Sequence, residues 1–111
     1  MLNLETLMEG VVKVLIVDDH KLISEAWSSL LKDAPQITVC ATADSESSAY
    51  DQAYIHKPDI VLMDINLGSG SGISAASRIL DSLPKTRVIG LSLHDDISYV
   101  KRFYPLAPRA T

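Results

Sequence analysis

The sequence predicts a doubly wound α/β fold, in which a mostly parallel sheet carries helices on both faces. Short apolar runs rich in β-branched residues alternate with longer amphipathic runs along the chain. This alternation is typical of βαβ units with right-handed crossovers. The length of 111 residues suits a single domain, and 47% apolar with 22% charged residues is ordinary for a folded globular chain.

Four runs are expected to form strands because they are short, rich in Val, Ile and Leu, and bounded by turn residues. The first and third of them are nearly continuous in apolar side chains, as in strands buried on both faces, and the second run alternates. The expected strands are Val12–Val17, Ile37–Ala41, Asp59–Met63 and Arg87–Leu91.

Amphipathic runs between these strands predict the helices. The apolar stripe from Lys21 to Asp33 places Trp27 in the core and Ser24 on the opposite face. Ser45 is expected to cap a helix that reaches about His56. Two further helices are expected, one built on Ile73–Leu83 and closed by Pro84, and one over Asp95–Tyr104, ended by Pro105.

Composition excludes several classes of function. Ten basic and 14 acidic residues give a net charge of −4, so no basic stripe is available for direct nucleic-acid binding. No apolar run approaches the roughly 20 residues of a membrane-spanning helix. Cys40 is the single cysteine, which suits a reducing cytoplasm. Residues 1–10 are interpreted as an N-terminal extension and residues 11–111 as the domain.

Acidic residues stand at the ends of two expected strands. Asp18 and Asp19 follow the first strand, and Asp64 follows the third. In the flavodoxin-like strand order 2-1-3-4 these strands are neighbours, and ligands of such sheets bind at the carboxyl ends of the strands. Three converging carboxylates repel one another unless a divalent cation neutralises them, and Mg²⁺ suits oxygen ligands. Alternatively, Asp19 simply caps the next helix. His20 is interpreted as a helix-start residue rather than a ligand.

Three motifs then resemble a known family. IVDDHKLISEA, VLMDINL with Gly72 after it, and GLSLHDD resemble the receiver domain of bacterial two-component response regulators. The resemblance covers Val12 to about Tyr99. The DDH opening and LSLHDD are similar to the LuxR/NarL-type branch, whose full-length members carry a helix-turn-helix after the receiver.

The resemblance implies a role for each matching residue. Asp64 would be the phosphoacceptor, receiving a phosphoryl group from a sensor histidine kinase. Asp18, Asp19, Asp64 and the backbone carbonyl of Asn66 would bind Mg²⁺. Ser92 would be the switch hydroxyl that donates a hydrogen bond to the phosphoryl group. The chain would then be a signalling domain rather than a classical enzyme, and it would regulate an output, transcription, that this chain does not encode.

Two departures from the family pattern stand out. Gly68 replaces the usual Pro four residues after the phosphoacceptor, which predicts a mobile loop. The family's fifth strand is expected to be missing or altered, and its Lys would fall beyond Thr111. Arg87–Leu91 would then be an open sheet edge. We therefore expect self-association, or a segment Phe103–Thr111 that folds back or swaps to cover the gap.

Three other functions are considered. A degenerate receiver would not be phosphorylated and would act as a protein-interaction module, which the missing Lys favours. A haloacid dehalogenase-type phosphohydrolase needs a second Asp at position 66, where this chain has Asn66. A flavodoxin-like flavin carrier is disfavoured because the loop after the first strand is acidic. Cys40 is interpreted as a small hydrophobe rather than a nucleophile.

Overall fold

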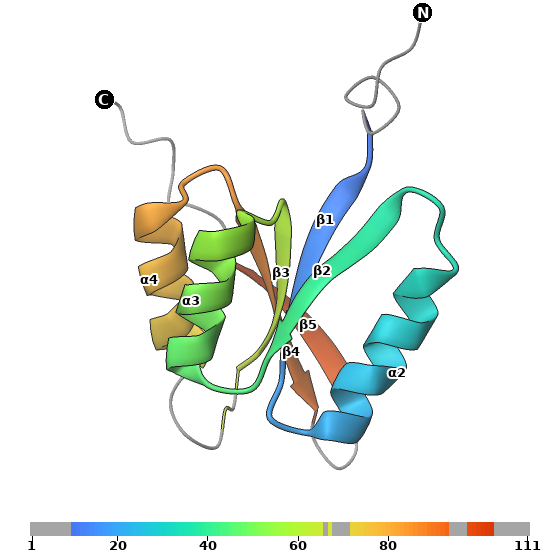
Figure 1. The fold of residues 1–111 in the computed structure, drawn as a ribbon. Coiled ribbons are helices and arrows are strands. Elements are labelled where there is room, and N and C mark those ends of the chain that lie inside the picture. Colours follow the sequence, from blue (N-terminus) through green and yellow to red (C-terminus); the bar gives the residue numbers. More distant parts are fainter. Residues whose placement is uncertain (1–9, 66, 68–71, 94–97, 104–111) are drawn as a thin grey trace, which may run out of the picture.

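The fold is a single sheet with helices on both faces (Figure 1). The computed structural model describes residues 10–65, 67, 72–93 and 98–103. Four parallel strands are ordered β2-β1-β3-β4, and β5 pairs with β4 in the antiparallel direction. This confirms the predicted fold class. The elements are β1 Val12–Val17, α2 Lys21–Lys32, β2 Ile37–Ala43, α3 Glu46–His56, β3 Ile60–Asp64, α4 Gly72–Ser82, β4 Arg87–Leu93 and β5 Ser98–Phe103.

The last element differs from the sequence prediction. The helix expected over Asp95–Tyr104 is wrong, because Ser98–Phe103 forms β5, with Leu93 paired to Ser98 and Val88 paired to Phe103. The segment SYVKRF contains aromatic and β-branched residues that suit a strand. Pairing also supplies hydrogen-bonding partners along the outer side of β4, which would otherwise be an exposed edge.

The expectation of an open edge at Arg87–Leu91 is therefore wrong. β5 covers β4 from Val88 to Leu93 and becomes the edge strand in its place. The chain does fold back, through Ser98–Phe103. Of the segment Phe103–Thr111 that was expected to do so, only Phe103 lies within the described residues. Because β4 is paired with β5, self-association can no longer be inferred from an open edge at β4.

The main core lies between the sheet and the helices α3 and α4, which cover one face (Figure 1). The helices contribute mostly alanines, which let their backbones approach the sheet closely, and the strands contribute larger side chains. The fully buried members include Leu15, Val17, Val61, Met63 and Val88 from the strands and Ala49, Ala53, Ala75 and Ile79 from the helices. This core fixes β1 and β3 side by side, which positions the site described below.

The other face carries α2, the one helix on that side within the described residues. Its predicted orientation is partly wrong. Ser24, expected on the polar face, is buried at 9% exposure, whereas Leu22 and Leu30 are 80% and 67% exposed. Trp27 is half-buried rather than in the core. The apolar stripe is wider than the strip of sheet that α2 covers, so one flank of it remains in solvent.

Local contacts fix α3 against α4. Ser45 caps α3 as expected: its Oγ accepts from the Ser48 backbone N–H at 3.1 Å, and Ser48 Oγ accepts from the Ser45 N–H at 3.1 Å. Ser48 thereby takes the part that Glu or Gln has in a capping box. Across the helix pair, the Arg78 guanidinium lies 4.5 Å from the centre of the Tyr50 ring. The Arg78–Tyr50 contact thus joins α4 to α3.

Candidate functional site

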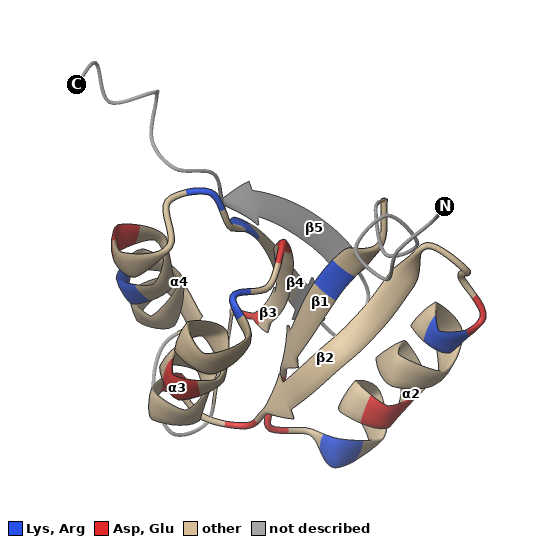
Figure 2. Ribbon diagram, turned by 45° about the horizontal axis from the view of Figure 1, so that its top comes forward, with Lys and Arg blue, Asp and Glu red and all other residues tan. Residues whose placement is uncertain are grey.

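The acidic residues lie at the carboxyl ends of two adjacent parallel strands. Val17 pairs with Met63, so Asp18, directly after β1, and Asp64, the last residue of β3, come to the same edge of the sheet. Carboxylate oxygens of Asp18, Asp19 and Asp64 lie within 4.8 Å of one another. In Figure 2, acidic segments in red lie where β1 and β2 end. The strand order thus brings these three side chains together, as the sequence led us to expect.

His20 completes this cluster. Its Nδ1 lies 2.9 Å from Asp18 Oδ1, 3.1 Å from Asp19 Oδ1 and 3.7 Å from Asp64 Oδ2. The hydrogen bond to Asp18, followed by the charge of Asp19, raises the pKa of His20 above its ordinary value of 6.5. His20 is indeed the N-cap residue of α2, but the interpretation as a helix-start residue missed its contact with all three acids. The sequence did offer one indication of this contact, because His20 directly follows Asp18 and Asp19.

Backbone contacts hold Asp18 in place. The Asp18 N–H donates to the Ala43 carbonyl at 3.0 Å, which continues the β1–β2 pairing one residue past β1. Asp18 Oδ1 accepts from the His20 N–H at 2.8 Å, a tight local turn. The side chains of Asp18 and Asp64 are only 10% and 13% exposed, whereas His20 is 65% exposed. The two acids are thus recessed, and the imidazole lies over them on the solvent side.

The donor set fits a magnesium ion. Mg²⁺ binds oxygen at about 2.0–2.1 Å in octahedral geometry, so two of its ligands are at most about 4.2 Å apart. The carboxylate oxygens of Asp18, Asp19 and Asp64, within 4.8 Å of one another, need only small side-chain rotations to reach that spacing. Partial exposure of Asp19 leaves room for the water ligands that Mg²⁺ retains. The exposed imidazole of His20 has room to swing away from the carboxylates.

Gly72 is a residue whose role sequence reasoning missed. It begins α4, and its N–H donates to the Ile65 carbonyl at 3.1 Å. A Cβ at this position would lie 2.7 Å from the Cα of Ile65 and closer still to the Asp64 carbonyl oxygen. The sequence indicated Gly72 only as part of a motif. The structure shows instead that a glycine is required for α4 to contact the backbone of Asp64.

The remaining predicted site residues are Ser92, Asn66 and Gly68. Ser92 lies in β4, one residue beyond Leu91, which pairs with Asp64. Its backbone therefore lies at the acidic edge of the sheet, next to the end of β3. Asn66, whose backbone carbonyl was expected to bind Mg²⁺, and Gly68, expected in a mobile loop, both fall outside the described residues.

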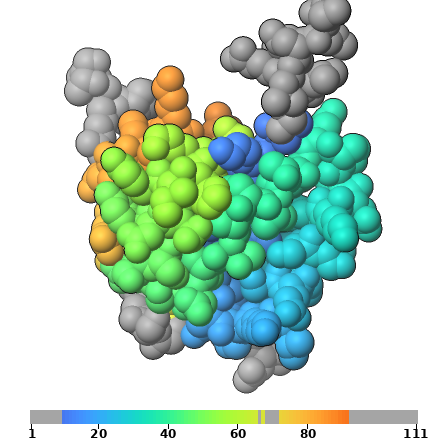
Figure 3. Space-filling model, viewed as in Figure 1, coloured from blue at the N-terminus to red at the C-terminus, as the bar shows by residue number. Residues whose placement is uncertain are grey.

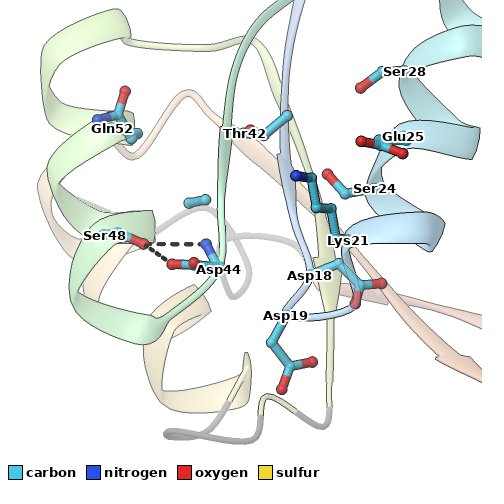
Figure 4. A pocket seen from close by; sticks show the side chains of 11 residues that line it. Asp18, Asp19, Lys21, Ser24, Glu25, Ser28, Thr42, Asp44, Ser48 and Gln52 are labelled. Atoms are coloured by element: carbon cyan, nitrogen blue, oxygen red, sulfur yellow. Dashed lines mark hydrogen bonds between the residues drawn. The ribbon is translucent and has the colours of Figure 1, made fainter.

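A groove extends from the acidic cluster between α2 and α3 (Figure 3, with α2 in sky blue and α3 in green). Its volume is about 610 Å³, and it passes over the end of β2. Figure 4 shows its polar lining, which includes Lys21 and Glu25 of α2 and, on the far side, Asp44 and Ser48. Ser48 Oγ is already engaged, since the Asp44 N–H donates to it at 3.2 Å. The groove is thus a polar extension of the acidic site.

The last sequence assignments concern Cys40 and the membrane. Cys40 is half-buried in β2 with its Sγ 3.4 Å from the Val14 carbonyl oxygen, and burial raises the pKa of its thiol. A neutral, partly buried thiol packs as a small hydrophobe, as interpreted.

Among the described residues, none of the helices has the length and apolar character needed to cross a membrane.

The fold and the acidic edge are those expected of a receiver domain, and comparison with known families gives the same class. The family description "Response regulator receiver domain" matches residues 14–107. This match covers most of the chain, so the protein belongs to the response regulator receiver domain family.

Relatives in sequence place the chain within that family. It is 36% identical over 90 residues to the oxygen regulatory protein NreC of Staphylococcus haemolyticus, covering 80% of this chain and 42% of NreC. It is 33% identical over 96 residues to the transcriptional regulatory protein DegU of Brevibacillus brevis, covering 86% of this chain and 41% of DegU. The chain therefore spans well under half the length of these relatives.

Solved structures support the same assignment. A LuxR-family two-component response regulator from Aurantimonas sp. matches with a TM-score of 0.72 and 29% identity, over 77% of this chain and 61% of that chain. The signal receiver domain of the putative response regulator NarL from Mycobacterium tuberculosis matches with a TM-score of 0.69 and 30% identity, over 77% and 68%. The chain is thus similar to receiver domains of LuxR-family response regulators, as its motifs implied.

Proposed function

We propose that this receiver domain accepts a phosphoryl group on Asp64 from a sensor histidine kinase. The observation that carries the proposal is the convergence of Asp18, Asp19 and Asp64 from the ends of two adjacent strands. A receiver fold alone would not require this convergence, because fold and function are separable. The acidic edge is what a Mg²⁺-dependent phosphoacceptor needs.

In the proposed reaction a carboxylate oxygen of Asp64 attacks the phosphorus of a phosphohistidine on the kinase. The P–O bond forms as the P–N bond breaks, so Asp64 becomes an acyl phosphate. The kinase imidazole leaves with the electron pair of the P–N bond and takes up a proton. The recessed, backbone-anchored position of Asp64 orients its carboxylate for this attack.

The other site residues assist this step. Asp18, Asp19, Asp64 and the Asn66 carbonyl would hold Mg²⁺, which when bound neutralises charge on the phosphoryl oxygens. Ser92 would donate a hydrogen bond to the phosphoryl group and stabilise the phosphorylated state. His20 lies over the carboxylates from the solvent side, where the phosphoryl donor must approach, so it has to move aside during the reaction.

The proposed output rests on the relatives, of which this chain covers less than half the length. DegU is named as a transcriptional regulatory protein, and the chain covers 41% of it. We therefore propose that phosphorylation of Asp64 regulates transcription through an effector outside this chain. The proposed setting is the cytoplasm, in keeping with a single cysteine kept as a thiol.

A mass measurement tests the proposed function. Incubation with acetyl phosphate and Mg²⁺ should add one phosphoryl group to the intact protein, and Asp64→Asn should abolish the gain. Asp51→Asn is the matched control, because Asp51 is an exposed aspartate of α3 away from the site. Phosphorylation that persists in Asp64→Asn, or fails in the parent chain, would refute the assignment.

One observation favours the alternative of a degenerate receiver that acts as a protein-interaction module. Because β5 runs antiparallel to β4, Lys101 pairs with Gly90, two residues back from Ser92 along β4. A lysine at the carboxyl end of a parallel fifth strand would instead lie at the acidic edge. If phosphorylation requires a lysine at the acidic edge, the parent chain will bind Mg²⁺ yet gain no mass with acetyl phosphate.

A further inference from the structure

We propose that the His20 imidazole closes over the phosphoryl group on Asp64, an inference that rests on the function proposed above. In the closed position an imidazole N–H donates a hydrogen bond to a phosphoryl oxygen. His20 thereby slows hydrolysis and sets the lifetime of the acyl phosphate. It is a positioning residue, additional to the phosphoacceptor, the metal ligands and Ser92.

The imidazole already lies beside the place that the phosphoryl group would take. His20 Nδ1 is 3.7 Å from Asp64 Oδ2 and 2.9 Å from Asp18 Oδ1. Because Asp64 is recessed and His20 is exposed, a phosphoryl group added to Asp64 extends toward this ring. A charge-assisted hydrogen bond from nitrogen to oxygen spans about 2.7–2.9 Å. A short rotation that withdraws the ring from the carboxylates therefore brings it onto the phosphoryl oxygens.

The backbone of His20 is held at both ends, whereas its ring takes no part in holding the helix. The His20 N–H donates to Asp18 Oδ1 at 2.8 Å, and its carbonyl accepts from the Ser24 N–H at 3.0 Å. His20 is the N-cap residue of α2, yet its side chain accepts no hydrogen bond from the first turn of the helix, which the structure describes in full. The ring can therefore move without loosening the start of α2.

The phosphoryl group needs a donor on its solvent side. Its three terminal oxygens are strong acceptors. The bound metal would neutralise one of them, and Ser92 would donate to another, so the third is left for His20. An imidazole carries at least one N–H whether or not it is protonated. Lys21, the next basic residue along the chain, extends instead into the groove between α2 and α3 (Figure 4).

Hydrolysis is the reaction that His20 would slow. A water oxygen bonds to phosphorus as the P–O bond to Asp64 breaks, and Asp64 leaves with the electron pair as a carboxylate. Both hydrogens of the water remain on the released phosphate. The water has to approach in line with the breaking bond, from the side opposite Asp64. This is the solvent side, where the imidazole lies, so a closed ring obstructs the attack.

Lifetimes of the phosphorylated protein test this role. The chain would be phosphorylated with acetyl phosphate and Mg²⁺, the donor removed, and the loss of phosphoryl mass followed in the parent, His20→Ala, His20→Leu and His20→Asn. Leu and Asn have nearly the same shape, but only Asn carries an N–H, at the distance from the backbone where His20 has Nδ1. Loss of a hydrogen bond to a charged group should shorten the lifetime roughly tenfold in the Ala and Leu variants. His20→Asn should keep most of it.

His56→Ala is the matched control. His56 ends α3, just before β3 begins, and so lies at the opposite edge of the sheet from Asp64. Its removal should leave the lifetime unchanged. An unchanged lifetime in His20→Ala, a lifetime in His20→Leu equal to that of the parent, or equal lifetimes in His20→Asn and His20→Ala would each overturn the proposal.

A spectroscopic readout locates the ring. The ¹⁵N signals of the imidazoles would be compared with Mg²⁺ alone and with Mg²⁺ plus beryllofluoride, which mimics the phosphoryl group. The His20 ring signals should shift with beryllofluoride and the His56 ring signals should not. Equal responses of the two rings would overturn the closure of His20 while leaving phosphorylation of Asp64 intact. A parent chain that gains no mass with acetyl phosphate would instead refute the proposed function, and the role of His20 with it.

Discussion

Substitution of Gly72 by alanine should damage both stability and the proposed phosphoacceptor. The added Cβ would lie 2.7 Å from the Ile65 Cα, where ordinary contact begins at 3.4 Å, so the backbone must separate by at least about 0.7 Å. Overpacking of this kind costs about 1–3 kcal/mol. The better helix propensity of alanine offsets up to about 1 kcal/mol of that cost. With the full offset the expected loss in unfolding free energy is about 0–2 kcal/mol, centred on about 1 kcal/mol.

The same displacement acts on the site, because the closest atom to the added Cβ is the Asp64 carbonyl oxygen. Misplacement of a reacting group by about 1 Å can slow a reaction by up to about a hundredfold. Urea denaturation measures the stability change, and the rate of mass gain with acetyl phosphate measures the chemical one. The control is Ser77→Ala, at an exposed position of the same helix. If Gly72→Ala matched Ser77→Ala in both assays, the close-contact argument would be refuted.

Three further predictions concern the metal, the switch and a helix cap. Asp18→Asn/Asp19→Asn should weaken Mg²⁺ binding by at least roughly tenfold in titration calorimetry, and an unchanged affinity would exclude these ligands. Ser92→Ala should leave phosphorylation of Asp64 largely intact but lower the population of the activated state by roughly tenfold, since it removes a hydrogen bond to a charged group. Beryllofluoride-induced amide shifts identical to those of the parent would rule this out. Ser45→Ala should cost about 1 kcal/mol of unfolding free energy, measured against Ser47→Ala on the exposed side of α3.

The acidic site was predictable because it depends on strand order and strand ends alone. Val12–Val17 and the run ending at Met63 are recognisable as buried strands from apolar content, and parallel strands finish at a common edge. The positions of Asp18 and Asp64 then follow without any knowledge of side-chain packing. The Ser45 cap was also predictable without knowledge of tertiary packing, because capping is a local interaction within four residues.

The errors arose where tertiary surroundings decide between local alternatives. The segment Ser98–Phe103 is short enough to suit either a helix or a strand, and the unpaired side of β4 selects the strand. The wide apolar stripe of α2 does not specify which part is buried, so Ser24 was placed on the wrong side. The contact of Gly72 with the Asp64 backbone depends on the approach of α4, which spacing along the chain does not encode.

The antiparallel pairing of β5 has a consequence for how the domain opens. Leu93 pairs with Ser98 a few residues on, whereas the parallel strands pair across whole helices, as Val12 does with Ile37. The β4–β5 hairpin therefore closes at little entropic cost and can reopen and reclose locally. β1 and β3, which carry Asp18 and Asp64, are held by their own neighbours on both sides. Fraying of β5 would therefore leave the β1–β3 pairing beside Asp18 and Asp64 intact, and among the site residues it would release only Ser92 of β4 from its partner Tyr99.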